Sequence, residues 1–368
     1  MLWDPDRHEP LSADWDAQTA REGIREIVAD AEAAFTGLWP QHPLDDPNDE
    51  KWTTMYCGAA GVAHALTRLG STRDWAGEAR RFLDVYIASP ETGARVPSLM
   101  VGEVGIRAVA NLDHYDLIAA NIENPALEWL WGAPGTMLPA LTMFERSGER
   151  RWRDLYDRNA EHLAKTFAYA EGVWMWTQSL CDEDVRLLGA AHGFAGNMYA
   201  LLRGGADRTI IDRAIQTLQA TAIRDGDLVN WAPQVGKPRK GREKMLVQWC
   251  HGAPGMITSL VRLPREPELD ALFLGAAELV WRAGPVAKGP GLCHGTAGNG
   301  YALLAMAERT GDSLWLERAR RFAIHALGQV RGARTEYGVG RYSLWTGDVG
   351  VALFVQDCLA GRGELPQL

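Results

Sequence analysis

Two short segments of the chain carry a cysteine followed directly by a histidine and a glycine. They are WCHGAPG, with Cys250 and His251, and GLCHGTAGNG, with Cys293 and His294. Thiolate sulfur and imidazole nitrogen are natural zinc ligands, and three protein ligands leave the fourth tetrahedral position open for a substrate. The two segments therefore predict one catalytic zinc site. Spacing alone leaves both His251 and His294 as candidates for the imidazole ligand.

An open position on zinc favours the activation of a thiol. The charge of the metal stabilises a bound thiolate far more than a thiol, so the thiol would lose its proton at neutral pH. Five cysteines are an odd number, which argues against a disulfide framework. The other three lack the Cys-His-Gly context, and we interpret them as small buried hydrophobic residues: Cys57, Cys181 and Cys358.

A third segment, AAHGFAG, has a histidine without a cysteine. Its His192 has an ordinary pKa of about 6.5, which suits acid–base chemistry; the competing interpretation is a hydrogen-bonded packing histidine. Glu128 lies four residues before Gly132 in ALEWLWG and would reach the same loop end, where it could orient His192 or shuttle a proton. The competing interpretation of Glu128 is an exposed carboxylate on a helix.

These segments belong to a repeat that positions them. Gly-x-x-Gly followed by an apolar run occurs seven times, with starts 30 to 61 residues apart, at Gly58, Gly102, Gly132, Gly193, Gly252, Gly295 and Gly347. We expect the first glycine to turn the chain into a helix at positive φ. The second should remove a side chain so that a neighbour or ligand can approach the backbone.

Amphipathic helices are predicted between the apolar ones. Residues 71–89, 148–167, 207–220 and 311–327 show apolar positions every three or four residues, as does the first predicted helix, 17–36. Its apolar face comprises Ala20, Ile24, Ile27, Val28 and Ala31. Seven pairs of buried and covering helices predict an all-α toroid with the glycine loops gathered at one end. An open solenoid of helix pairs is the alternative.

Composition is that of a soluble globular protein, with 46% hydrophobic and 23% charged residues. The net charge of −9 disfavours nucleic acid as a partner, and no apolar run is long enough to span a membrane. The acidic start lacks the features of a signal peptide, so we expect a cytoplasmic protein. We divide the chain into an N-terminal helix and linker, 1–50, and a toroid domain, 51–368. The fifteen tryptophans suit aromatic packing between helices or a lined cavity.

The motifs identify a family. WCHGAPG (249–255) and GLCHGTAGNGYALL (291–304) resemble the two zinc-ligand motifs of the lanthionine synthetase C-like family. AAHGFAG is similar to its histidine motif, and SLWTGDVG (343–350) to its last repeat; the likeness runs from about residue 50 onward. The resemblance implies an α/α toroid of seven helical hairpins, with Cys250, Cys293 and His294 as ligands of one zinc ion.

Membership would imply zinc-assisted addition of a thiol to dehydroalanine or dehydrobutyrine, with His192 handling the proton and Glu128 at an acidic position of the family. In one branch the thiol is a cysteine of the same peptide, which forms a lanthionine ring. In the other branch the thiol is glutathione and the acceptor is a damaged protein. His251 and Lys288, five residues before Cys293, are similar to the glutathione-using branch, and Arg334 is a weaker match to a cationic position there. We therefore favour glutathione.

Two rival functions remain at this level. A non-catalytic zinc-containing module that binds glutathione or a protein would keep the ligands and tolerate loss of His192. A glycosidase on an α/α ring would need two opposed carboxylates, and Glu128 has no evident second partner. A basic loop, PQVGKPRKGREK (233–244), runs into the first cysteine motif and could contact an anionic or acidic substrate.

Overall fold

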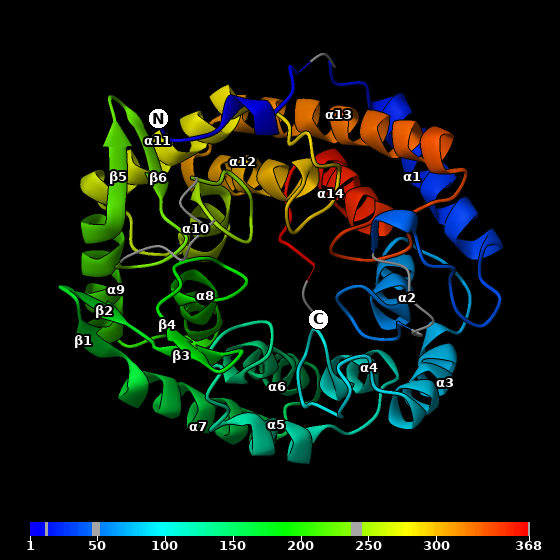
Figure 1. Cartoon of the computed structure of the whole chain (residues 1–368), viewed down its shortest axis with the longest axis horizontal. Helices are drawn as coiled ribbons and strands as arrows, with labels where there is room; N and C mark the ends of the chain where they lie inside the picture. The colour runs from blue at the N-terminus through cyan, green and yellow to red at the C-terminus, as the bar shows by residue number, and fades with distance from the viewer. Residues whose placement is uncertain (12–13, 46–51, 237–244, 367–368) are drawn as a thin grey trace.

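The chain forms two concentric rings of helices. The computed structural model describes residues 1–11, 14–45, 52–236 and 245–366, and this part of the chain holds fourteen α-helices that alternate between an outer and an inner ring (Figure 1). The outer helices are α1 (Ala17–Ala33), α3 (Trp75–Ala88), α5 (Tyr115–Asn121), α7 (Arg150–Thr166), α9 (Arg208–Thr221), α11 (Pro267–Ala283) and α13 (Ser313–Tyr337). The inner helices are α2 (Ala59–Arg68), α4 (Glu103–Val109), α6 (Ala133–Ser147), α8 (Phe194–Gly204), α10 (Ala253–Leu260), α12 (Thr296–Thr310) and α14 (Asp348–Ala360). The predicted all-α toroid is confirmed.

Burial explains why the two rings differ. Inner helices are packed on all sides; in α14 every residue from Asp348 to Val355 is buried. Outer helices bury one stripe, which in α1 includes Ala20, Ile27 and Ala31 as predicted. Helix α1 packs against α13 and α14, so it belongs to the outer ring. The domain division at residue 50 stays a prediction.

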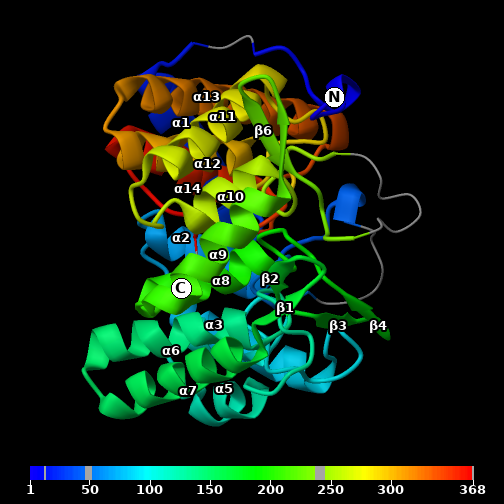
Figure 2. The same ribbon diagram turned by 90° about the vertical axis from the view of Figure 1, so that its left-hand side faces the viewer.

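Short strands, which the sequence analysis did not predict, lie in two of the connections. Two antiparallel hairpins, β1–β2 (Ala168–Ala170, Val173–Met175) and β3–β4 (Gln178–Leu180, Glu183–Val185), link α7 to α8. A third, β5–β6 (Ala222–Asp225, Leu228–Trp231), follows α9. Strands of three or four residues are too short to show alternation in a sequence. Hairpin β3–β4 projects at one end of the ring (Figure 2) and carries Cys181 at its tip.

The loops before the inner helices are here called loops 1 to 7, and backbone hydrogen bonds join loops 5, 6, 7, 1 and 2 in that order. In each of these bonds the residue two positions before the first glycine donates its N–H to its counterpart in the next loop. Cys250 donates to Cys293 (3.0 Å), Cys293 to Trp345 (2.9 Å), Trp345 to Tyr56 (3.2 Å) and Tyr56 to Met100 (2.8 Å). The bond from Trp345 to Tyr56 joins loop 7 to loop 1. It closes the ring and excludes the open solenoid.

The first glycine of each repeat serves a different purpose from the one predicted. Only Gly252 of the seven has a positive φ, of 110°; the others begin their helices with φ between −99° and −170°. The general expectation of a left-handed turn was therefore wrong. A β-carbon at Gly193 or Gly347 would instead collide with the backbone carbonyl of Leu187 or Arg341. Close approach of the backbone six residues earlier in the same loop, more than φ, requires glycine there.

The second glycine permits two close approaches, as predicted. In all seven loops a β-carbon at this position would collide with the carbonyl oxygen six residues earlier. It would also meet a side chain from the previous loop. That side chain belongs to the residue six positions before the second glycine of that loop. At Gly61 these two atoms are the Met55 carbonyl oxygen and, 2.9 Å away, the β-carbon of Leu344 from loop 7. The missing side chain of each second glycine thus allows the neighbouring repeat to pack against the backbone at this position.

Replacing Gly61 by alanine will destabilise the ring at its closure. We expect the free energy of unfolding to fall by about 2–4 kcal/mol, because the new methyl group faces a rigid carbonyl and cannot be accommodated by rotation. The matched control is Gly328→Ala, in the exposed middle of α13, where a β-carbon meets nothing within 4 Å. That change should stabilise the chain by about 0.5–1 kcal/mol. Urea titrations of both variants measure the difference; equal effects would contradict the account.

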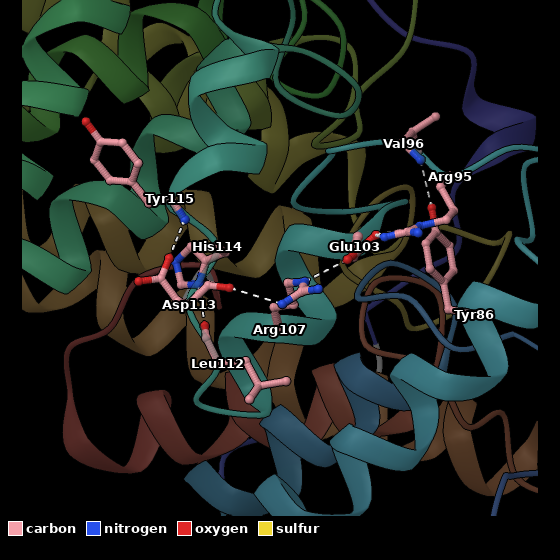
Figure 3. A network of polar contacts seen from close by, with 9 residues as sticks. All are labelled: Tyr86, Arg95, Val96, Glu103, Arg107, Leu112, Asp113, His114 and Tyr115. Carbon is pink, nitrogen blue, oxygen red and sulfur yellow. Dashed lines mark hydrogen bonds and ion pairs between the residues drawn. The ribbon is translucent and has the colours of Figure 1, made fainter.

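Loop 2 is anchored by a buried carboxylate. Glu103, the first residue of α4, is 1% exposed and accepts hydrogen bonds from Arg107 (2.7 Å) and Arg95 (2.9 Å), as Figure 3 shows. Arg107 also donates to the Asp113 carbonyl (3.2 Å). These contacts link loop 2, whose Met100 accepts the N–H of Tyr56, to the beginning of α5.

Candidate metal centre

Cys250, Cys293 and His294 lie together where loops 5 and 6 meet. One ligand atom from each residue lies within 4.8 Å of the other two. The Cys250–Cys293 backbone hydrogen bond sets this spacing, because it brings equivalent positions of two neighbouring loops side by side. Both cysteines are buried, and His294 is half-buried. With Zn–S bonds of about 2.3 Å and Zn–N bonds of about 2.0 Å, the set suits a tetrahedral zinc ion.

The two thiols shift each other's pKa. Their mutual hydrogen bond lowers the pKa of Cys250 well below its usual value, and a second hydrogen bond, with His294, acts in the same direction. The same bond and burial raise the pKa of Cys293. A divalent cation that binds both sulfurs would displace their protons. A donor set of this chemistry fits zinc.

His251 lies outside the donor set, so the structure brings His294, and not His251, to the two cysteines. The His251 backbone pairs with Gln248 in a tight turn, with Gln248 N–H to His251 O and His251 N–H to Gln248 O both 3.2 Å. Its ring lies 6.3 Å from that of His192, centroid to centroid, and is inclined to it by 25°. The ring of His251, the residue after the ligand candidate Cys250, is thus a neighbour of the His192 ring.

His192 is oriented by Glu128. Its Nδ1 lies 3.0 Å from Glu128 Oε2, and its side chain is 31% exposed. Because an ionised carboxylate only accepts hydrogen bonds, Nδ1 carries the proton, and Nε2 would exchange a proton with a substrate. The pair bridges loops 3 and 4, the side of the ring next to loop 5.

Glu128 itself is completely buried, at 0% exposure, on the loop before α6. Its carboxylate also accepts the backbone N–H groups of Leu130 (2.9 Å) and Trp131. The alternative of an exposed helix carboxylate is therefore wrong. Of the two roles considered, this geometry suits orientation of His192, because the buried carboxylate has no exposed atom to present to a substrate.

Three tryptophans pack against one another behind the site. The ring centroids of Trp129, Trp249 and Trp345 lie 4.5–5.4 Å apart, and all three side chains are at most 2% exposed. Trp129 follows Glu128 and Trp249 precedes Cys250, so the cluster supports both halves of the site. Aromatic packing of this kind restricts movement of the loops that carry them.

Two residues of the site escaped the sequence analysis. Gln248 Nε2 donates a hydrogen bond to Cys250 Sγ at 3.0 Å, and the Tyr56 hydroxyl opposes the rise in the pKa of Cys293. Burial raises the pKa of Tyr56 well above its usual value, which keeps this hydroxyl protonated. Tyr56 occupies in loop 1 the position that the cysteines occupy in loops 5 and 6. Alignment of the seven repeats on their glycines would have identified it.

Lys288 is exposed on the segment that leads from α11 to Cys293. The N-terminal strap, which contains the 3-10 helix Pro5–Arg7, pairs with this segment: Ala287 N–H donates to Arg7 O and Glu9 N–H to Pro285 O, both at 3.0 Å. The strap thereby fixes the backbone beside Lys288. Binding of a substrate by Lys288 stays a prediction.

Arg334 lies at the end of α13 and is engaged by two acids. Its guanidinium contacts Asp348 (2.9 Å) and Asp30 (3.1 Å), and Asp348 is 4% exposed. Burial raises the pKa of Asp348 to about 6, while Arg334 opposes that rise. Binding of a substrate by Arg334 stays a prediction. The contacts of Arg334 with the two acids also predict an effect on stability.

Arg334→Met should lower the free energy of unfolding by about 3 kcal/mol, because a buried carboxylate loses its partner. The pKa of Asp348 would then rise further above its unfolded value. Since the folded chain would hold the proton more tightly than the unfolded chain, stability falls as pH rises, and the loss should be larger at pH 8 than at pH 5. Denaturation at both pH values measures it. An unchanged stability with a raised KM for the thiol would instead favour the substrate-binding role.

The remaining sequence predictions have mixed outcomes. Residues 237–244 of the basic loop lie outside the described residues. Cys358 is fully buried, as predicted, and Cys57 is partly buried. Cys181 is exposed, so its interpretation as a buried residue was wrong; the hairpin that carries it was not foreseen. Among the described residues, no helix combines the length and apolar character needed to cross a membrane.

Comparison with known proteins gives consistent matches. The model of a family described as lanthionine synthetase C-like protein matches residues 14–365. The chain is 36% identical over 192 residues to glutathione S-transferase LANCL1 from Danio rerio, covering 49% of this chain and 45% of that protein. It is 37% identical over 143 residues to LanC-like protein GCL1 from Arabidopsis thaliana, covering 38% and 32%. The matches thus span less than half the length of these curated relatives.

A solved structure shares the fold. Nisin cyclase matches with a TM-score of 0.59 and 12% sequence identity, covering 94% of this chain and 100% of that one. At this identity the likeness concerns the arrangement of helices alone.

Proposed function

The chain belongs to the lanthionine synthetase C-like family, and we propose that it adds a thiol, preferably glutathione, to dehydroalanine or dehydrobutyrine residues of a peptide or protein. The observation that carries the proposal is the juxtaposition of a Cys-Cys-His donor set with an oriented histidine. The name of the relative from Danio rerio, a glutathione S-transferase, supports the choice of thiol.

One zinc ion would be held by Cys250, Cys293 and His294. When bound, it supplies a positive charge that lowers the pKa of an incoming thiol at the open fourth position. The chain contributes two thiolates, which keep the site electron-rich. It also contributes the packed tryptophan side chains that hold the loops in place. Zinc stays a prediction that metal analysis can test.

The bond changes are simple. The sulfur of the thiolate forms a bond to the β-carbon of the dehydro residue, and the π electrons of the C=C bond move to the α-carbon and its carbonyl. His192 Nε2 then delivers one proton to the α-carbon, which replaces the proton that the thiol lost. No strong bond is broken, so positioning and thiol activation account for most of the acceleration.

Glu128 determines which nitrogen of His192 faces the substrate and donates the proton. Its carboxylate holds the His192 Nδ1 proton at 3.0 Å and stabilises the imidazolium that must form before Nε2 can donate. The two backbone N–H groups that bind Glu128 hold its carboxylate in position. We therefore assign proton delivery to His192 and its orientation to Glu128.

Two other functions use the same residues. A lanthipeptide cyclase would take the thiol from a cysteine of the same peptide and form a lanthionine or methyllanthionine ring. A zinc-containing module that binds glutathione or a protein without catalysis would need the donor set but not His192. The oriented His192–Glu128 pair favours an enzyme over such a module.

The test offers the purified chain, after metal analysis, a dehydroalanine-containing peptide and glutathione. We expect about one zinc ion per chain and a peptide product whose mass increases by that of glutathione. A second peptide with both a cysteine and a dehydroalanine distinguishes the cyclase, because its ring closes without a change in mass and consumes the free thiol. Zinc-loaded chain that accelerates neither reaction over buffer would refute the catalytic proposal.

A further inference from the structure

Each cysteine of the donor set also interacts with a side chain outside the set. Gln248 Nε2 lies 3.0 Å from Cys250 Sγ and donates a hydrogen bond to it, and the Tyr56 hydroxyl acts on Cys293 in the direction that lowers the pKa of that thiol. Neither donor belongs to the Cys-His-Gly motifs. The two contacts come from different loops, so they are not a by-product of one local turn.

Both donors are held in place by backbone contacts. The Gln248 backbone exchanges two hydrogen bonds with His251, and its side chain is half-buried. Tyr56 donates its N–H to Met100 and accepts from Trp345, and its ring lies nearly parallel to the Trp345 indole, 6.2 Å away and inclined by 5°. Donors this restrained can act on sulfur without an entropic cost at the moment of reaction.

The proposed reaction creates a selection problem. An electrophilic alkene must approach a centre that holds the substrate thiolate and also the two ligand thiolates. Attack by a ligand would destroy the site: the Cys250 sulfur would bond to the β-carbon, the π electrons would move to the α-carbon, and that carbon would take a proton from water. The resulting thioether is neutral and a poor ligand for zinc.

Hydrogen bonding offers a way to select the nucleophile. A donor that points at a thiolate withdraws electron density from its sulfur lone pairs and must be displaced or weakened before that sulfur can attack. We propose that Gln248 and Tyr56 are positioning residues that suppress the nucleophilicity of Cys250 and Cys293, so that the substrate thiol reacts instead. The idea that the substrate thiolate is selected over the ligand thiolates rests on the proposed function. The lowering of each ligand sulfur's reactivity by its neighbouring donor does not depend on that function.

The test measures alkylation of each cysteine directly. Zinc-loaded chain is treated with iodoacetamide, in which the thiolate sulfur forms a C–S bond, the C–I bond breaks and iodide leaves; peptide mass mapping then follows each cysteine separately. Gln248→Leu should raise the alkylation rate of Cys250 by about three- to tenfold and leave that of Cys293 nearly unchanged. Tyr56→Phe should do the reverse.

Matched variants separate this effect from general loosening. Gln219→Leu removes an exposed amide on α9 that pairs with Glu268, and Tyr156→Phe removes a buried hydroxyl that donates to Ala200 O. Neither should change the alkylation of Cys250 or Cys293. Gln248→Glu, which keeps the shape but has no N–H, should repeat the result of Gln248→Leu. It serves as the second variant if leucine disturbs the loop.

The outcomes distinguish the two proposals. Wild-type chain without stoichiometric zinc would refute the metal centre before any alkylation is measured. Zinc-loaded variants that are alkylated at the wild-type rate, or equally at both cysteines, would overturn the assignment of Gln248 and Tyr56. If the rates change as expected, treatment of the same variants with the dehydroalanine peptide should yield adducts at Cys250 or Cys293 and parallel release of zinc.

Discussion

Cys293→Ala will empty the metal centre. With Cys293 removed, one sulfur and one imidazole remain, and Cys250 also loses the hydrogen bond that lowers its pKa. Loss of outer-shell partners alone weakens metal sites by about 10- to 100-fold, so loss of a direct ligand should exceed about 100-fold. Thiol addition should fall to the rate in buffer, because no site remains that activates the thiol.

Metal analysis after dialysis and competition with a chromogenic chelator measure this effect. We expect about one zinc ion in the wild-type chain and almost none in the variant. Cys181→Ala is the matched control, since that thiol is exposed at the tip of the β3–β4 hairpin and lies outside the donor set. Full retention of zinc by Cys293→Ala would show that the donor set has been assigned wrongly.

His192→Asn should leave zinc in place and slow thiol addition by about 10²- to 10⁴-fold, the range for loss of a general acid. His192 is outside the donor set, and its contacts are with Glu128 and the neighbouring His251 ring. Asparagine keeps a polar group near Glu128 but cannot carry a titrating proton. Single-turnover mass spectrometry with saturating glutathione would isolate the addition step.

Glu128→Gln should produce a smaller loss, together with a shift in the pH profile. The amide cannot stabilise the imidazolium that donates the proton, so the decline of activity with rising pH should begin at a lower pH. His162→Asn on the outer helix α7 is the control histidine. If His192→Asn formed the thioether as fast as the wild type, the assignment of proton delivery would be wrong and the non-catalytic binder would gain support.

The sequence was informative wherever the constraint is local. The repeat is visible because each second glycine must clear a carbonyl only six residues earlier in the chain, as at Gly61 and Met55. Alternation of apolar and amphipathic segments likewise follows from burial of each helix. These constraints recur every 30 to 61 residues, so the count of seven hairpins and the toroid could be predicted before any contact between them was known.

Partners distant in the chain could not be predicted. Spacing left both His251 and His294 open and only the family resemblance implied His294, which the structure places beside the two cysteines. Glu128 was ambiguous because its burial depends on loop 4 and on His192, 64 residues away. Arg334 matched a cationic position by sequence, yet its charge is engaged by Asp30 and Asp348, which only the packing of α1 and α14 brings to it.

By itself, the sequence determined the residue types of the donor set, the repeat that carries them and the class of chemistry they suit. Spacing left open which histidine joins Cys250 and Cys293, and tertiary structure brings His294 to them, as the resemblance implied; it also revealed Gln248 and Tyr56, whose side chains act on the two sulfurs. The physical reason is ring closure. Hydrogen bonds between equivalent positions of successive loops, including the one from Trp345 to Tyr56, bring together residues that no local pattern connects.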